Sequence, residues 1–467
     1  MNDISRIKGA AGPLTLAGVP TGFLPWLMTD LARAATKRAV FIATDEAEMR
    51  GVADTAHWFA PEVRVLTFPA WDCLPYDRAS PSLRVTSERM ATLSALQDKV
   101  GGPRLLVTTV NAASQRTLTP FRLRQLVAKL APGERIDRDD LAKLLQANGY
   151  VRTETVADAG DYAVRGSLVD LFPSGMEHAL RLDFFGDEIE SIRSFDPADQ
   201  RTIGPVEGFT LLPASESLID EESIKRFRSR YRETFGATAT GDPLYQAISE
   251  GRRLAGMDHW LPLFEDKLAT FFDHIGADDI IVRDAGSPGA VDARFEGIGD
   301  YHGNRVRAAS SDPGSYRPLP ADALYLTRQE WDGLLSERRA HLVSGFHEPG
   351  SANVLDFGID GPRDFGAERS RSENVYEALA DYRKSLEKTG LVLASYSAGS
   401  RQRLAGLVAD HGLTDAAMAD DWQHAQALAA KGKVALAVVP LERGFVAPAL
   451  AVVTEQDLLG DPRHRVG

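Results

Sequence analysis

Cysteine is nearly absent from this sequence, since Cys73 is the single one among 467 residues. One thiol forms no disulfide within the chain and excludes metal sites built from several cysteines. No apolar run approaches the roughly 20 residues that a membrane helix needs. The first residues also lack a basic stretch followed by an apolar core, which is the pattern of a signal peptide. These absences predict a cytoplasmic protein without membrane contact.

The motifs of common catalytic and ligand sites are absent as well. The 10 histidines include no His-x-x-x-His pair. No G-x-S-x-G elbow occurs, and the G-K-[ST] end of a phosphate-binding loop is found nowhere. Cys73 follows an aromatic residue and an acid, with no His or Lys adjacent, which indicates an inert thiol. The sequence therefore predicts no catalytic residue, no cofactor and no metal ion.

Positive charge is scarce in this chain. Lys and Arg number 53 against 66 Asp and Glu, which gives a net charge of −13. Proteins that grip duplex DNA usually present a basic face, because much of their affinity comes from neutralising phosphates. The acidic balance and the lack of a long basic run argue against strong DNA binding and favour a protein partner. The length suggests roughly three or four domains.

A strand at 14–19 and a helix at 23–36 flank a glycine-bearing turn. This is the setting of a phosphate-binding loop, in which the pattern G-x-x-x-x-G-K-[ST] places backbone amides and a lysine around phosphates. Gly18 and Gly22 stand one residue closer than that pattern requires, and Phe23 with the leucine after it replaces the Lys and Ser/Thr. We interpret the segment as a nucleotide-binding scaffold that has lost the residues needed to bind phosphate.

The chain then alternates strands and helices, which predicts an α/β fold with a parallel sheet covered on both faces. The stretch Asp45-Glu46-Ala47-Glu48 superficially resembles the acidic box of ATP-driven helicases. Asp45 is better interpreted as the cap of the next helix, because acids in a first turn suit the helix dipole. Residues 345–372 have the composition of a linker to a small α/β unit. Strands are predicted at 39–44, 64–68, 105–109, 280–282, 323–326 and 340–343, and helices at 46–59, 84–98, 221–234 and 243–251.

Residues 161–196 read as a run of short antiparallel strands joined by turns. Side chains two residues apart share one face of a strand. An exposed Phe beside an exposed Arg is typical of a binding hot spot. The alternative is that a loop covers Phe185 while Arg181 and Asp183 form a surface pair. The alternation directs Leu180, Leu182 and Phe184 into a core, and Arg181, Asp183 and Phe185 outward.

Several segments together resemble the family of transcription-repair coupling factors. GDYAVRGSLVDLFPSGMEHALRLDFFGDEIESIRSFDPADQRT resembles the UvrB-homology module of that family. FPAWDCLPYDRASPSLRVTSERMATL and GMDHWLPLF resemble its first domain, and EQDLLG resembles the close of its third. The segments follow the family's order and span essentially the whole chain. UvrB itself shares the middle module but has an intact phosphate-binding loop, which this chain lacks.

The resemblance implies a multidomain α/β fold. A UvrB-like parallel-sheet domain with a degenerate phosphate-binding loop would be split by an inserted strand-rich α+β module, and a small α/β domain would follow. The UvrB-like halves would be 1–119 and 214–355, the inserted UvrA-binding module 120–213, and the small domain 366–460. The family's UvrA contacts match Arg165, Arg181 and Phe185 here, and strand alternation agrees for the last two.

The resemblance also implies a non-catalytic role, in which the chain recruits UvrA to stalled RNA polymerase in transcription-coupled nucleotide excision repair. The family's full protein continues into an RNA-polymerase-binding domain and an ATP-driven DNA translocase, and this chain is expected to stop before both. RNA polymerase and duplex DNA would then be reached only through regions outside it, and the chain would be a monomer. One alternative is an ATP-using, DNA-binding protein of the UvrB kind. Another is a free-standing regulator that competes with UvrB for UvrA.

Overall fold

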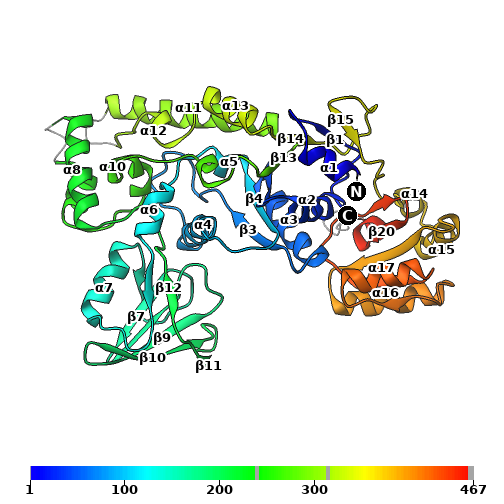
Figure 1. Ribbon diagram of the computed structural model, residues 1–467, viewed down its shortest axis with the longest axis horizontal. Coiled ribbons are helices and arrows are strands. Elements are labelled where there is room, and N and C mark those ends of the chain that lie inside the picture. Colours follow the sequence, from blue (N-terminus) through cyan, green and yellow to red (C-terminus); the bar gives the residue numbers. More distant parts are fainter. Residues whose placement is uncertain (1, 237–240, 312–315, 461–467) are drawn as a thin grey trace.

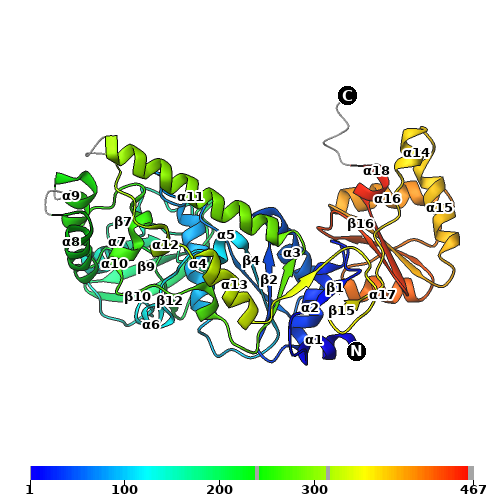
Figure 2. The same cartoon turned by 90° about the horizontal axis from the view of Figure 1, so that it is seen from above.

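The computed structural model describes residues 2–236, 241–311 and 316–460. The molecule is elongated, with a strand-rich module toward one end and a C-terminal unit at the other end of a central parallel sheet (Figure 1, Figure 2). None of the helices within these ranges is both long and apolar enough to cross a bilayer. The architecture confirms the predicted multidomain α/β fold.

The central sheet has the strand order β15-β1-β14-β13-β2-β4-β3, and all its strand pairs are parallel. Strand β2 (Ala39–Ala43) is buried along its whole length, as a continuous apolar run requires in a sheet covered on both faces. Val40 and Ile42 belong to the core on one face, and Phe41 belongs to the core on the other. The other strands are β1 (Thr15–Ala17), β3 (Arg64–Phe68), β4 (Arg104–Thr109), β13 (Ile280–Asp284), β14 (His341–Val343) and β15 (Val354–Asp356).

Helices cover both faces of this sheet (Figure 2). Asp45 caps α3 (Glu46–Phe59) by accepting a hydrogen bond from the Glu48 amide at 2.9 Å, which confirms its interpretation as a cap. Residues 321–324 form the short helix α12 after Pro320, so the strand predicted at 323–326 is wrong. The other helices around the sheet are α1 (Asn2–Lys8), α2 (Leu24–Ala34), α4 (Leu83–Ala95), α5 (Val110–Ala113), α6 (Pro120–Gln125), α11 (Ser287–Ser311) and α13 (Arg328–Glu337).

The predicted linker at 345–372 is tied to both of its neighbours. Its strand β15 pairs with β1 at the edge of the central sheet. Asp360 then forms a β-bridge with Val446 of the C-terminal unit. Residues 345–372 therefore connect the two units while packing against both, and Leu355 is buried in the core of the central sheet.

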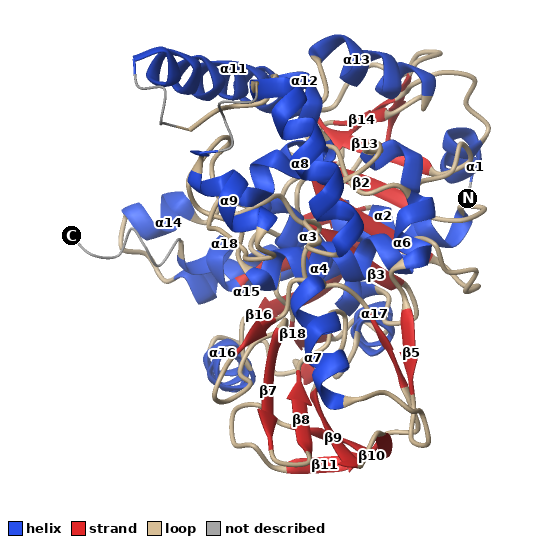
Figure 3. Cartoon of the chain, turned by 90° about the vertical axis from the view of Figure 1, so that its left-hand side faces the viewer, coloured by secondary structure: helices blue, strands red, loops and turns tan. Residues whose placement is uncertain are grey.

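The inserted module contains a six-stranded sheet in the order β11-β10-β9-β8-β7-β6. Its strands β7 to β11 are labelled in Figure 3. Neighbouring strands are antiparallel except for the parallel pair β6–β7. The inner face packs on α7 (Arg138–Ala147), whose Leu141 and Leu145 are fully buried. The strands are β6 (Val151–Arg152), β7 (Asp161–Arg165), β8 (Leu168–Leu171), β9 (Ala179–Phe185), β10 (Glu188–Phe195) and β11 (Thr202–Pro205), beside a separate pair of β5 (Ala128–Leu130) and β12 (Phe209–Leu211).

A buried ion pair joins the end of this module to the central domain. The Arg89 guanidinium donates to both carboxylate oxygens of Glu216, at 2.8 and 3.0 Å. The Trp71 indole donates to the same carboxylate at 2.8 Å, and neither charged side chain is more than 1% exposed. Loss of either partner would leave a buried charge unpaired, so this contact ties the segment after the module to helix α4. The helices α8 (Glu221–Phe235), α9 (Pro243–Ser249) and α10 (Leu261–Phe264) follow.

The C-terminal unit has a five-stranded sheet in the order β17-β18-β16-β20-β19, parallel except for β19. Aromatic rings join it to α2 and α3. Trp422 packs edge-on against Trp26 and Phe59, with ring centroids 5.0 and 4.8 Å apart. Its elements are α14 (Gly366–Ser370), α15 (Val375–Ser385), β16 (Gly390–Ser395), α16 (Ala398–Asp410), β17 (Ala417–Met418), α17 (Trp422–Ala430), β18 (Val434–Val438), β19 (Phe445–Ala447), β20 (Leu450–Thr454) and α18 (Glu455–Leu459).

Candidate protein-binding surface

Strand β9 alternates as the sequence predicts. Leu180 and Leu182 are fully buried and Phe184 is 5% exposed, whereas Phe185 is 79% exposed. The three inner side chains pack in the module core beside α7. Phe185 stands in solvent just before the turn at Gly186, so the alternative that a loop covers it is wrong.

The three residues implied as UvrA contacts share the outer face of the six-stranded sheet. Residues paired across antiparallel strands present their side chains on the same side. Arg165 on β7 pairs with Leu168 on β8, and Leu168 pairs with Asp183 on β9. Asp183 lies two residues from both Arg181 and Phe185, so all of these side chains belong to one face. We call Arg165, Arg181, Asp183 and Phe185 the outer patch.

Arg181 is held by the protein itself. Its Nε and Nη2 donate to the two carboxylate oxygens of Asp170 at 2.7 and 2.8 Å. Its guanidinium carbon lies 4.8 Å from the ring centre of the buried Phe195, which is a cation–π contact. The hydrogen bond to Asp170 raises the pKa of Arg181. The expectation that Arg181 points freely outward is therefore corrected, since the side chain is only 19% exposed.

Arg165 is exposed and is anchored to a neighbouring loop. Its Nη2 donates to the backbone carbonyl of Glu154 and to the Thr155 hydroxyl, the latter at 3.0 Å. These contacts orient the guanidinium along the edge of the module without burying it. Arg165 therefore presents a fixed positive charge on the outer face.

The outer face is covered at one end and open at the other. A small apolar cluster of Val156, Ala163, Ala179 and Phe195 buries the first residues of β9 under the loop that leads into β7. Along the strand, exposure increases from Ala179 through the half-buried Arg181 and Asp183 to Phe185. The outer face is therefore most exposed at the Phe185 end of the strand.

Asp170 is the residue at this surface that the sequence analysis missed. It lies on β8 directly opposite Arg181 in the β8–β9 register. Its side chain is 3% exposed, so it is a buried carboxylate that needs the guanidinium beside it. The available signal was an acid inside the apolar segment Leu168-Val169-Asp170-Leu171, where strand alternation puts it on the outer face with Leu168.

In the turn between β1 and α2, several backbone amides donate hydrogen bonds to carbonyl groups of the chain. Gly18 and Val19 each donate to a carbonyl of the loop after β14, at 2.9 Å. Phe23 and Leu24 donate to the Pro20 carbonyl at 2.9 and 3.1 Å. A phosphate-binding loop keeps such amides for the oxygens of its ligand. In this turn, four amides are instead bonded to the chain.

The C-terminal unit fills the space beside this turn. A Cβ atom added to Gly22 would lie 2.1 Å from the carbonyl oxygen of Arg443, so only glycine allows this close approach. The Phe23 ring packs edge-on against Phe445, with centroids 5.4 Å apart. The residue that stands at the lysine position of a phosphate-binding loop therefore serves an interface between two parts of the molecule.

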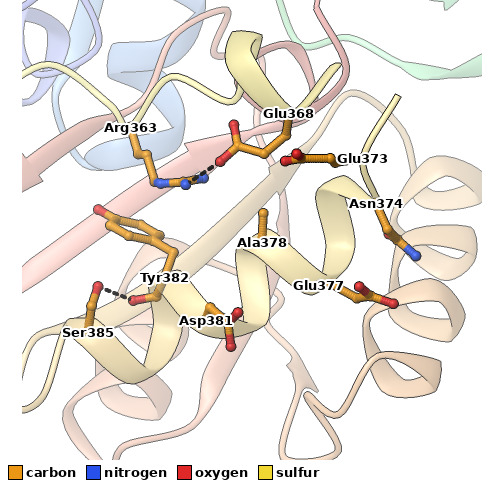
Figure 4. A pocket seen from close by; sticks show the side chains of 9 residues that line it. All are labelled: Arg363, Glu368, Glu373, Asn374, Glu377, Ala378, Asp381, Tyr382 and Ser385. Carbon is orange, nitrogen blue, oxygen red and sulfur yellow. Dashed lines mark hydrogen bonds and ion pairs between the residues drawn. The ribbon is translucent and has the colours of Figure 1, made fainter. Parts of the chain in front are cut away.

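Other groups that could react or bind a ligand are isolated or buried. Burial raises the pKa of the Cys73 thiol to about 12, which leaves it protonated and unreactive. Within the described ranges, no three His, Cys, Asp or Glu side chains are placed to hold a metal ion. A pocket of about 530 Å³ beside α15 is rich in carboxylates and contains the Arg363–Glu368 ion pair (Figure 4). Its residues are Arg363, Glu368, Glu373, Asn374, Glu377, Ala378, Asp381, Tyr382 and Ser385.

Two stretches of the chain match known domain families. Residues 128–216 match the family described as the UvrB interaction domain. This range contains the six-stranded sheet and all of the outer patch. Residues 386–458 match the family described as the MFD, D3 domain, which corresponds to most of the C-terminal unit.

Curated relatives carry the name transcription-repair-coupling factor. The protein of Escherichia coli strain K12 is 31% identical over 456 residues, which is 97% of this chain and 38% of that protein. The protein of Haemophilus influenzae is 41% identical over 220 residues, covering 47% of this chain and 19% of its own length. The protein of Rickettsia bellii is 25% identical over 422 residues, 90% of this chain and 36% of that protein. The chain thus spans less than two fifths of the length of these relatives.

Proposed function

This chain corresponds in sequence to the N-terminal region of the transcription-repair-coupling factors, and we propose that it recruits UvrA through the outer patch. In this role it would bring UvrA to stalled RNA polymerase in transcription-coupled nucleotide excision repair. The match of residues 128–216 to a UvrB interaction domain supports the choice of partner. The name of the relatives, transcription-repair-coupling factor, supports a role in transcription-coupled repair.

The observation that carries the proposal is the exposure of Phe185. A large aromatic side chain that is 79% exposed at the open end of a sheet face is costly to leave in water unless a partner covers it. Aromatic and Arg side chains are also the residues that most often dominate binding energy at interfaces. Phe185 would supply apolar area to a pocket on UvrA.

The two arginines would add charged contacts with fixed geometry. Asp170 and Phe195 orient Arg181, and the loop at 154–155 orients Arg165. Side chains that are already ordered lose little further freedom on binding. The Asp170 pair uses Nε and Nη2 of Arg181 and leaves Nη1 outside the pair. A planar guanidinium of this kind suits carboxylates on UvrA better than a lysine would.

We propose further that the chain is an adaptor without nucleotide chemistry of its own. The bonded amides of the turn at 18–24 and the contact between Gly22 and Arg443 both support the loss of a phosphate site. RNA polymerase, duplex DNA and ATP would then be engaged by regions outside this chain. The chain itself would be a monomer, with a UvrB-like domain at 1–119 and 214–355, the UvrA-binding module at 120–213 and a small domain at 366–460.

Calorimetric titration with UvrA tests the role of the outer patch. Phe185→Ala should weaken binding by on the order of 2 kcal/mol, roughly thirtyfold, as expected for a hot-spot residue. The matched control is Phe346→Ala, since Phe346 is 82% exposed but lies in the loop after β14, where its carbonyl accepts from the Gly18 amide and not from the module. If Phe185→Ala binds UvrA as tightly as the parent, or if Phe346→Ala loses as much affinity, the outer patch is not the binding surface.

A further inference from the structure

A cleft of about 770 Å³ lies between the central domain and the inserted module. Residues of the edge strand β3 and helix α4 line one side of it, and residues of the small sheet β5–β12 line the other. Its size is in the range of protein ligand pockets. None of its lining residues belongs to the outer patch, so it is a separate feature of the surface.

The backbone of β3 has an open edge beside this cleft, whose lining includes Arg64 and Leu66 of the strand. Strand β3 ends the seven-stranded sheet, with β4 as its one neighbour among the described strands. The Arg64 amide donates to the Pro103 carbonyl at 3.0 Å, on the β4 side. Because peptide groups alternate between the two edges of a strand, Val65 and Thr67 direct theirs toward the open edge. The hydroxyl of Thr92 donates to the Thr67 carbonyl at 2.6 Å, whereas no described group bonds to the amide or carbonyl of Val65.

The cleft is basic in a protein of strongly acidic balance. Arg64, Arg124 and Lys129 line it, and Asp98 is the one carboxylate in its described lining. Arg124 donates to the Gln97 side chain at 3.3 Å, and none of the three cations forms an ion pair within the described ranges. With a net charge of −13 on the whole chain, this local excess of positive charge favours an acidic occupant.

Apolar side chains form the remaining walls of the cleft. Leu66 projects from β3, Leu123 and Val127 come from α6 and the turn after it, and Met176 comes from the turn before β9. Val127 is 36% exposed, so its apolar surface is accessible from the cleft. An open strand edge, apolar walls and unpaired cations together match the recognition of an extended peptide, in which the backbone joins a sheet edge and alternate side chains enter pockets.

We propose that this cleft binds an extended, acidic segment of a partner protein, which adds as a strand along the open edge of β3. The backbone of the segment would pair with the Val65 amide and carbonyl. Its carboxylates would meet Arg64, Arg124 and Lys129, and its apolar side chains would cover Leu66 and Val127. The site is independent of UvrA recruitment, because it lies on the side of the module where β5 and β12 face the central domain.

A fluorescent peptide of alternating Glu and Val, about ten residues long, is a suitable probe for a strand-like ligand. Fluorescence anisotropy with the full chain should detect binding, and a matched Lys and Val peptide should not bind. The double variant Arg64→Glu, Lys129→Glu should weaken binding of the acidic peptide about tenfold or more. The double variant Lys431→Glu, Lys433→Glu makes the same charge change at exposed positions of the C-terminal unit and should leave binding unchanged.

Two further measurements test the strand addition itself. Hydrogen exchange should slow at Val65 when the peptide is bound. Val65→Pro removes the outward amide but no bond to β4, because this amide faces away from β4. Proline is tolerated on such an edge. It should weaken peptide binding while thermal melting stays cooperative. Absence of binding at about 1 mM peptide, equal binding by the Arg64→Glu, Lys129→Glu variant, or tighter binding of a single-stranded oligothymidylate at the same site would overturn the proposal.

Discussion

Arg181 and Asp170 form a two-point ion pair on the outer face of the inserted module, with N–O distances of 2.7 and 2.8 Å. The carboxylate is almost fully buried, at 3% exposure, and the arginine closes over it. The same guanidinium covers Phe195. One side chain thus contributes both to the stability of the module and to the surface that we propose for UvrA.

Arg181→Ala should therefore destabilise the protein as well as weaken UvrA binding. The substitution leaves the Asp170 carboxylate buried without a partner, which costs on the order of 3 kcal/mol. Urea denaturation of the parent and the variant measures this loss. The double variant Arg181→Ala, Asp170→Ala should lose less stability than the two single variants combined, because the buried charge is gone. A fully stable Arg181→Ala protein would show that the pair contributes nothing to folding.

Phe185→Ala and Leu182→Ala should behave in opposite ways in thermal melts. Phe185 faces solvent, so its loss should change the free energy of unfolding by no more than about 0.5 kcal/mol. Leu182 is fully buried beside α7, and its truncation should cost roughly 2–5 kcal/mol. Equal losses for the two variants would contradict the orientation of β9.

Strand alternation allowed the faces of β9 to be predicted from the sequence, because successive side chains along a strand point to opposite faces of the sheet. The Arg181–Asp170 pair could not be predicted in this way. It requires the register between β8 and β9, which the connection at 172–178 determines. The place of β15 was missed for a related reason, since its partner β1 lies far away in the sequence and the segment is too short to show a pattern.

The spacing of Gly18, Gly22 and Phe23 led to the prediction of a degenerate phosphate-binding turn, but the packing around this turn could not be predicted. The contact between Gly22 and Arg443 joins residues from opposite ends of the chain. Nothing local at Phe23 indicates that its ring packs on Phe445. Long-range packing of this kind depends on how the two units dock, which residue spacing does not encode.

The isolated chain should not bind ATP. Four amides of the turn at 18–24 already bond to carbonyls, and residues 443–445 fill the space beside it. Titration of a fluorescent ATP analogue in the presence of magnesium should give no change in anisotropy. Binding in the micromolar range that unlabelled ATP reverses would contradict this expectation and revive the UvrB-like alternative.

The stability of the protein should fall as the pH is lowered from about 6.5 toward 4, in part because of His341. Its Nδ1 accepts a hydrogen bond from the Leu14 amide at 3.1 Å, so the ring must be neutral. Burial, with a smaller contribution from Arg339, lowers its pKa to about 4. Between these pH values the unfolded chain binds the proton and the folded chain does not, so the free energy of unfolding rises with pH across this window. Above it the histidine contributes no pH dependence.

Urea denaturation at several pH values measures this effect. Each pKa unit corresponds to about 1.4 kcal/mol, so His341 contributes a loss of up to roughly 3 kcal/mol at the acid end. His274 adds a loss of the same sign, because burial lowers its pKa to about 4 as well. His341→Asn should remove about half of the pH dependence due to these two residues. If His341→Asn shows the same decline as the parent between pH 6.5 and 4, the ring is not held neutral by the fold.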